Sequence, residues 1–168
     1  MINKTVKKRS ISSNKLKKRL DINKKLGSKD LTSWLFKRYN IKKGDHILEV
    51  GCGVGQHIKI EKKIIGRKGL ILATDISQKS LKNIVYTKNV IVKKIAMEKL
   101  PKYLDKLNLK FDKIISSYAF YYANNPLGLL AKLKKYLKRK GKFFITTPCY
   151  PHTLTEFAKK NKTLSKKA

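Results

Sequence analysis

Short runs of apolar residues alternate along this chain with longer segments in which apolar residues recur every three or four positions. The short runs are rich in Ile, Val, Leu and Phe, and such continuous runs are typical of strands that are buried on both faces of a parallel sheet. They predict five strands, at residues 46–50, 70–74, 90–96, 111–116 and 142–147. The segments between the runs are long enough for the crossover helices that parallel strands require.

Helical spacing is clearest in two segments. The segment ahead of the first predicted strand has apolar residues at Leu31, Trp34, Leu35 and Tyr39. Ser28 or Asp30 is available there as the N-cap. Residues 126–138 carry a second stripe, made of Leu130, Leu133 and Leu137. The alternation of strands and helices predicts an α/β fold with a doubly wound, mainly parallel sheet of about five strands.

The chain has 168 residues, which is enough for one domain with its own hydrophobic core. Residues 1–26 hold ten Lys and Arg against one acid, Asp21, and few large apolar side chains. This composition predicts a flexible basic arm or a frayed helix. We expect the folded domain to span residues 27–150, and a short helix with a tail to occupy residues 151–168.

The net charge of +32 comes from 42 Lys and Arg against 10 Asp and Glu. A basic surface attracts nucleic acid through the release of counterions, so a nucleic-acid partner is one interpretation. Only five of the basic residues are Arg, whose forked guanidinium suits phosphate and guanine best, and the lysines are spread along the whole chain. A solvated basic surface, with the codon usage of an AT-rich genome behind it, is the alternative interpretation.

Membrane, secreted and metal-binding classes find little support in the sequence. No apolar run approaches the roughly 18 residues that cross a bilayer, and the basic start lacks the apolar segment of a secretory signal. Cys52 and Cys149 form neither a disulfide framework nor a metal-type pair, which fits a reducing compartment. The three histidines lack His-x-x-x-His spacing, so no metal site is predicted. We therefore expect a cytoplasmic protein without a membrane span.

The first predicted strand runs into three alternating glycines, within residues 51–55, ahead of a helical segment. Glycines allow a sharp turn and the close approach of a ligand, and ligands of open α/β sheets bind beyond the carboxyl ends of the strands. The spacing differs from the dinucleotide fingerprint Gly-x-Gly-x-x-Gly, and no Gly-Lys-Ser/Thr phosphate loop is present. Glu49, two residues before the first glycine, would repel a pyrophosphate and suits a cationic ligand.

Residues 48–55, Leu-Glu-Val-Gly-Cys-Gly-Val-Gly, resemble the first motif of the class I, Rossmann-like S-adenosylmethionine (SAM)-dependent methyltransferases. SAM carries a sulfonium and an amino group and no phosphate, in agreement with the acid at Glu49. The resemblance extends over residues 28–148 and includes Asp75, whose counterpart in the family grips both ribose hydroxyls. It departs at Ala96, where the family often has the Asp that holds the adenine amino group. This departure leaves adenine recognition to backbone atoms and Met97.

The resemblance implies that SAM is the cofactor. The cofactor-binding residues that it implies are Glu49, Gly51, Cys52, Gly53, Gly55, Asp75, Ile76, Met97 and Ser116. Ordinary structural roles are the alternative for three of them. Glu49 could be a carboxylate near a helix terminus, Asp75 a turn or cap residue, and Cys52 a small hydrophobic side chain in a tight turn.

The sequence identifies no catalytic residue. Methyl transfer from SAM is an in-line displacement with a good leaving group, so proximity and orientation can suffice. The residues after the fourth predicted strand that could line an acceptor pocket, or pack in the core instead, are Tyr118, Tyr121 and Tyr122. Residues 124–126 lack the Asn-Pro-Pro-Tyr pattern used on nucleobase amino groups. Pro148 and Cys149 resemble the Pro-Cys pair of cytosine C5 methyltransferases, but they follow the fifth predicted strand instead of the fourth.

The resemblance implies an enzyme that transfers a methyl group from SAM to an acceptor. We expect a small-molecule acceptor, because no nucleic-acid module is recognisable in the sequence. One alternative is an RNA or protein methyltransferase that uses the Lys-rich surface. The other alternative is an inactive or truncated SAM-fold module.

The fifth predicted strand is followed by a short segment. Members of the family usually follow it with a helix and an antiparallel pair of strands, whereas only 20 residues follow Pro148 here. We expect the sheet to lack that pair and the fifth strand to form an exposed edge, with Phe143, Phe144 and Ile145 on it. Because unpaired apolar edges invite association, the sequence predicts a dimer or a partner at this strand. The alternative is an incomplete domain of low stability with a poorly formed acceptor pocket.

Overall fold

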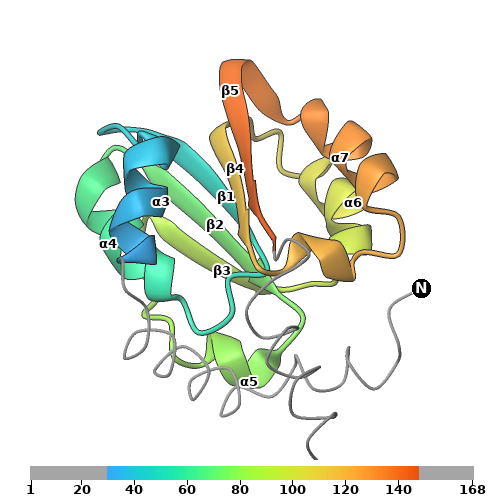
Figure 1. Ribbon diagram of the computed structural model, residues 1–168, viewed down its shortest axis with the longest axis horizontal. Coiled ribbons are helices and arrows are strands. Elements are labelled where there is room, and N and C mark those ends of the chain that lie inside the picture. Colours follow the sequence, from blue (N-terminus) through green and yellow to red (C-terminus); the bar gives the residue numbers. More distant parts are fainter. Residues whose placement is uncertain (1–29, 148–168) are drawn as a thin grey trace, which may run out of the picture.

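The computed structural model describes residues 30–147, which form a parallel five-stranded sheet with helices on both faces (Figure 1). The strands are β1 (His46–Val50), β2 (Leu70–Asp75), β3 (Val90–Lys94), β4 (Phe111–Ser117) and β5 (Leu137–Thr146). Their order across the sheet is β3-β2-β1-β4-β5, and all neighbours pair in parallel. The predicted α/β fold with a doubly wound sheet of about five strands is confirmed.

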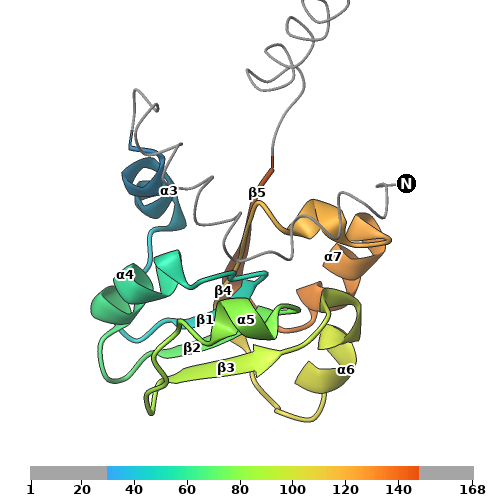
Figure 2. The ribbon, with the colours of Figure 1, turned by 90° about the horizontal axis from the view of Figure 1, so that it is seen from below.

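Helices cover the two faces in separate layers. The α-helices are α3 (Leu31–Tyr39), α4 (Gln56–Ile65), α5 (Gln78–Leu81), α6 (Leu100–Leu104) and α7 (Pro126–Lys134), and the 3-10 turns are η1 (Met97–Lys99) and η2 (Phe120–Tyr122). Figure 2 shows α3 and α4 on one side of the sheet and α6 and α7 on the other. Successive side chains of β1 therefore enter different hydrophobic clusters, Ile47 with α3 and α4, and Leu48 with α6 and α7.

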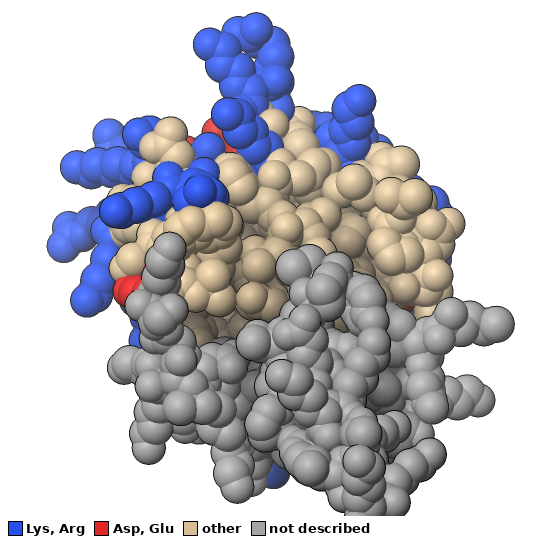
Figure 3. Space-filling model, viewed as in Figure 1, with Lys and Arg blue, Asp and Glu red and all other residues tan. Residues whose placement is uncertain are grey.

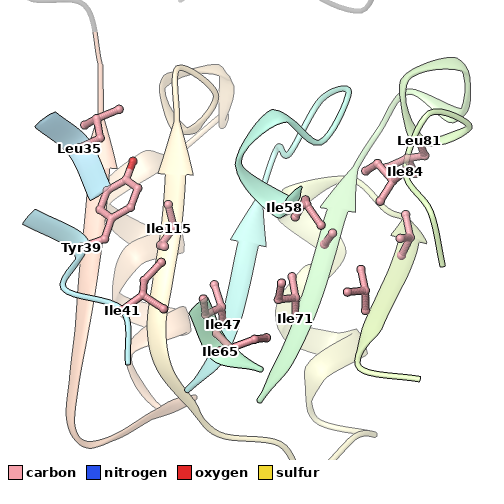
Figure 4. Close-up of a cluster of buried hydrophobic side chains, with 13 residues drawn as sticks. Leu35, Tyr39, Ile41, Ile47, Ile58, Ile65, Ile71, Leu81, Ile84 and Ile115 are labelled. Atoms are coloured by element: carbon pink, nitrogen blue, oxygen red, sulfur yellow. The ribbon is translucent and has the colours of Figure 1, made fainter. Parts of the chain in front are cut away.

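The cluster under α3 and α4 holds the first of these helical layers in place (Figure 4). Ile47, Ile71 and Ile115, from three adjacent strands, are fully buried there. Ile58 and Ile65, from α4, are buried against them. Since burial of one such side chain contributes about 1.5–3 kcal/mol, these contacts fix α4 firmly against β1.

The cap of α3 agrees with one of the two candidates in the sequence. Asp30 accepts hydrogen bonds from the backbone N–H groups of Thr32, at 3.0 Å, and Ser33, at 3.3 Å. These bonds satisfy two amides that the first turn of a helix leaves without intrahelical partners. Ser28, the other candidate, lies outside the described residues.

The predicted helix over residues 126–138 is wrong in its last turn. α7 ends at Lys134, and Leu137 is the first residue of β5 instead of the last of the helical stripe. Leu137 pairs with Phe111 of β4, whose N–H donates to the carbonyl of Tyr136 at 2.8 Å. Pairing with a neighbouring strand thus overrides a local pattern that suits a helix, and β5 begins five residues before its predicted start.

The other strands begin where the sequence predicts and end within two residues of their predicted ends. Within residues 30–147, β5 forms one edge of the sheet, and Ile145 on it is 38% exposed. Association through this edge stays a prediction. The basic arm, the C-terminal helix and tail, and Pro148 with Cys149 lie outside the described residues.

No helix in the described part of the chain combines the length and the apolar character that crossing a bilayer would require.

Candidate functional site

The glycine turn lies at the carboxyl edge of the sheet, where β1 leads into α4 (Figure 1). Gly51, Gly53 and Gly55 have positive φ angles of 75°, 56° and 76°. A Cβ on Gly51 would lie 2.2 Å from the Cβ of Ala119, and a Cβ on Gly55 would lie 2.6 Å from Cγ1 of Ile84. Conformation and space therefore both favour glycine at these two positions. The turn lies at the edge where open α/β sheets bind their ligands.

Asp75, the last residue of β2, ties its strand to this turn. Its Oδ2 accepts the N–H of Gly53 and its Oδ1 accepts the N–H of Ser77, each at 2.8 Å. The N–H of Gly51 bonds to the carbonyl of Thr74, also at 2.8 Å. A carboxylate oxygen has room for a second hydrogen bond, and the Asp75 side chain is only partly buried. Asp75 can therefore hold the turn and, at the same time, accept hydrogen bonds from the hydroxyl groups of a ligand.

The remaining predicted cofactor residues differ in how they are placed. Ile76 is 47% exposed beside Asp75, and Met97 is half-buried on η1. Ser116 is buried, and its hydroxyl donates to the carbonyl of Val50 at 2.8 Å, so its side chain joins β4 to β1. Burial raises the pKa of the Cys52 thiol, which disfavours the reactive thiolate and agrees with a hydrophobic role. Cofactor contacts from these four residues stay predictions.

The tyrosines predicted for an acceptor pocket follow β4 at the same edge of the sheet. Tyr118 is 38% exposed, and its φ of 55° is uncommon for a residue other than glycine. Its N–H donates to the carbonyl of Thr146 in β5 at 2.8 Å, which holds this conformation. Tyr121 and Tyr122 are half-buried, with ring centroids 4.3 Å apart. Of the three, Tyr118 is thus the one whose side chain is most open to an acceptor.

Glu49 lies in a buried cluster that the sequence did not predict. Its side chain is enclosed between β1 and α4, and its Oε1 lies 3.3 Å from Nδ1 of His57. Glu61, one helical turn after His57, is fully buried. The described residues offer no hydrogen-bond partner to either carboxylate oxygen of Glu61 or to Oε2 of Glu49. Two acids and one imidazole therefore share a space with few hydrogen-bond donors.

Burial controls the protonation of this cluster, because the protein interior disfavours the charged form of each group. Burial raises the pKa of Glu49 to about 8, although a side-chain hydrogen bond with a protonated Glu61 opposes the rise, and the nearby Asp75 carboxylate adds to it. Burial also raises the pKa of Glu61 well above its usual value, and Glu49 contributes. The pKa of His57 is lowered by burial, against the opposing attraction of Glu61.

A signal for these residues is present in the sequence of α4. The buried positions of this helix are Ile58, Glu61 and Ile65, so an acid lies within its apolar face. His57 is four residues before Glu61, which puts both side chains on one side of the helix. A buried acid usually has an ionic or hydrogen-bonding partner. Glu61 on the apolar face of α4 therefore indicates that a neighbouring side chain interacts with it.

A family model described as a methyltransferase domain matches residues 41–168 of this chain. The chain belongs to this methyltransferase-domain family. Within it, the five-stranded parallel sheet and the glycine turn identify a class I, Rossmann-like SAM-dependent methyltransferase domain, as the resemblance of residues 48–55 predicts. SAM is the cofactor of this family.

Individual relatives of this methyltransferase domain agree with that assignment. A tRNA U34 carboxymethyltransferase from Hydrogenovibrio crunogenus is 29% identical over 119 residues, which cover 65% of this chain and 34% of the relative. A SAM-dependent methyltransferase from Aquifex aeolicus has a TM-score of 0.52 and 26% identity, over 64% of this chain and 58% of that one. Fibrillarin from Aeropyrum pernix, crystallised with bound SAM, has a TM-score of 0.53 and 16% identity, over 62% of this chain and 46% of that one. This chain thus spans about a third of the curated relative's length.

The described residues of this methyltransferase domain fit SAM. Gly51 and Gly55 leave a cradle that a Cβ would fill, and Asp75 offers partly exposed carboxylate oxygens beside it. An acceptor-only side chain suits the two hydroxyls of a ribose. The absence of phosphate in SAM agrees with the partly exposed acid Asp75 at this edge of the sheet, whereas contact of the buried Glu49 with the cofactor stays a prediction.

Proposed function

We propose that this protein transfers a methyl group from SAM to an acceptor bound at the carboxyl edge of the sheet. The observation that carries the proposal is the contact between Asp75 and Gly53, at 2.8 Å. It brings the carboxylate that suits a ribose against the turn that leaves space for a ligand. Family membership supports the same activity.

The chain's own residues supply position and orientation in this proposal. When bound, SAM supplies a methyl group on a positively charged sulfur that is a good leaving group. Asp75 holds the ribose end, and the turn from Gly51 to Gly55 lets the backbone approach the ligand closely. Tyr118 then lines the space over β4 in which an acceptor approaches. Holding two reactants in line lowers the barrier without a general base when the acceptor is nucleophilic.

Binding and transfer are tested separately with the full-length chain. Calorimetry is expected to show one SAM site. Incubation with isotopically labelled SAM is then expected to move label into a small molecule of a cell extract that has been separated from its RNA and protein. Absence of SAM binding by the full-length chain would contradict the whole proposal. Label that appears only in the RNA or the protein fraction would exclude the small-molecule acceptor.

RNA is a second candidate acceptor, and the charge of the chain favours it. The net charge is +32, and the Hydrogenovibrio relative is named for action on tRNA. Figure 3 shows Lys and Arg side chains gathered along two sides of the described part. A hollow at the amino ends of β1 and β2 is lined by Lys43, Gly44, Arg67 and Lys68. This basic hollow lies at the opposite edge of the sheet from the glycine turn, where it would contact the backbone of a long RNA.

Replacing Lys43, Arg67 and Lys68 together with alanine is expected to weaken RNA binding and to leave SAM binding unchanged. Each phosphate contact contributes about 0.7–0.9 to the slope of log K against log salt, so the loss of three contacts should reduce the slope by about 2–3. Filter binding of tRNA over a salt series measures it. Lys135→Ala is the matched control, because Lys135 is already paired with Asp105 at 2.6 Å. A triple variant with an unchanged slope would exclude the basic hollow as an RNA contact.

A further inference from the structure

We propose that Glu49, His57 and Glu61 form a buried binding site for a first-row divalent metal ion, with Zn²⁺ as the expected occupant. Glu49 is also a predicted cofactor residue, but the proposal does not depend on methyl transfer, and its test needs no SAM. The three ligand atoms lie within 4.8 Å of one another. They come from the end of β1 and from one side of α4, so a bound ion would join this helix to the central strand.

The distances suit a small ion after a modest adjustment. Ligand bonds of about 2.0–2.2 Å to Zn²⁺ put the corners of a tetrahedron about 3.4 Å apart. Nδ1 of His57 and Oε1 of Glu49 are already 3.3 Å apart. The longest separation in the cluster is within 4.8 Å, so a rotation of the Glu61 side chain can complete the set.

The unsatisfied polar atoms of the cluster are independent evidence for a ligand. Both carboxylate oxygens of Glu61 and Oε2 of Glu49 are buried and have no hydrogen-bond donor among the described residues, and Nδ1 of His57 lies 3.3 Å from Oε1 of Glu49 without hydrogen-bond geometry. Buried polar groups in folded proteins nearly always have partners. A divalent cation would neutralise the two carboxylates and use the imidazole lone pair, which the 3.3 Å contact of His57 with Glu49 does only in part.

The surroundings favour a transition metal over Mg²⁺ or Ca²⁺. One imidazole and two carboxylates are an N,O set that suits Zn²⁺, whereas Mg²⁺ and Ca²⁺ require six or more oxygen ligands. The ring of Phe36 lies 5.3 Å from that of His57, and the ring of Tyr39 lies 6.1 Å from it. Such an apolar shell limits water in the site and leaves room for few ligands besides the three side chains.

The sequence predicted no metal site because its histidines lack His-x-x-x-His spacing. The tertiary fold provides a different set, in which His57 and Glu61 share one side of α4 and Glu49 faces them from β1. The other candidate occupant of the cluster is a proton shared between the two carboxyl groups. A bound metal ion requires Glu61 to be ionised, whereas a shared proton neutralises one of the two carboxyl groups.

A Zn²⁺ titration of the chelator-treated, full-length protein tests the proposal. Calorimetry is expected to show one site, and a hundredfold excess of Zn²⁺ over Kd is expected to raise Tm by about 10 °C. Mg²⁺ is expected to bind much more weakly. Co²⁺ in the site should give the visible d–d bands of a four-coordinate ion without a thiolate charge-transfer band, because the ligands are nitrogen and oxygen.

Glu61→Gln separates the metal from the shared proton, because it keeps the shape of the side chain and removes its charge. Zn²⁺ affinity is expected to fall at least about tenfold. In the absence of metal, the variant is expected to melt at or above the Tm of the parent, since an unpaired buried acid has been removed. His57→Gln removes the nitrogen ligand and serves as the independent variant if Glu61→Gln does not fold.

Two control variants test whether Zn²⁺ binding is specific to the cluster. Glu98→Gln changes an exposed acid outside the cluster and is expected to leave the Zn²⁺ titration unchanged. Replacing Cys149 with Ser and His152 with Asn removes other candidate ligands and should also leave it unchanged. Absence of Zn²⁺ binding by the parent, or binding that survives in both His57→Gln and Glu61→Gln, would overturn the proposal. A Glu61→Gln protein that melts higher than the parent both with and without Zn²⁺ would assign the cluster to a shared proton and overturn it as well.

Discussion

Replacing Asp75 with alanine is expected to lower the affinity for SAM at least about tenfold. Hydrogen bonds to a charged group contribute about 1.5–3 kcal/mol each, and 1.4 kcal/mol corresponds to a factor of ten in affinity. The variant loses the acceptor for the ribose hydroxyls, and it also releases the N–H groups of Gly53 and Ser77 that Asp75 now holds. Calorimetric titration with SAM measures the change.

A second substitution at this position separates the two effects. Asp75→Asn keeps one acceptor oxygen and the shape of the side chain, so it should retain part of the affinity that alanine loses. Asp105→Ala is the control, because Asp105 is an exposed acid paired with Lys135. Its SAM titration is expected to match that of the parent. An Asp75→Ala protein with the parent's affinity would remove Asp75 from the cofactor site.

Gly51→Ala is expected to lower Tm by about 10 °C and to abolish SAM binding. The new Cβ would lie 2.2 Å from the Cβ of Ala119, which forces β1 and the segment after β4 apart. Overpacking of this kind costs about 1–3 kcal/mol, and a positive φ adds about 1 kcal/mol for any residue with a Cβ. For a domain of this size, about 3 kcal/mol corresponds to roughly 10 °C. Thermal melting followed by SAM titration of the folded fraction checks both expectations.

Gly44 provides the matched control for Gly51. Its φ is 86°, but an added Cβ would meet nothing within 4 Å. Gly44→Ala should therefore show the cost of conformation alone, about 1 kcal/mol, and should bind SAM like the parent. Ala119→Gly combined with Gly51→Ala removes the nearest clashing atom and is expected to recover much of the lost Tm. Equal losses in Gly44→Ala and Gly51→Ala would show that the close approach to Ala119 is unimportant.

The strands of this fold could be predicted because their signal is local. Runs such as residues 46–50 and 70–74 carry apolar residues on both of the faces that a covered parallel sheet buries, so they predict strands without knowledge of their neighbours. The glycine turn is also local, since the backbone conformation of Gly51, Gly53 and Gly55 is accessible to few other residues. The resemblance of residues 48–55 to a known motif then indicated the ligand class.

The end of α7 shows where local reasoning stops. Leu137 continues the apolar spacing of Leu130 and Leu133, so the sequence alone favours one longer helix. Its pairing with Phe111 depends on a strand that lies far away in the sequence. No helical period contains that information, because strand pairing is decided by the neighbour that the fold brings alongside.

The sequence by itself determined the α/β class, the number of strands in the described sheet, the turn that leads from β1 to α4, and the family. Only the tertiary structure decided which side chains meet: Asp75 with Gly53, Ala119 with Gly51, and Glu49 with His57 and Glu61. The physical reason is that periodicity reports whether a position is buried, whereas contact depends on the order of the strands and on the face that each helix covers. Glu61 was an acid on a buried stripe in the sequence, and it became part of a cluster when α4 packed against β1.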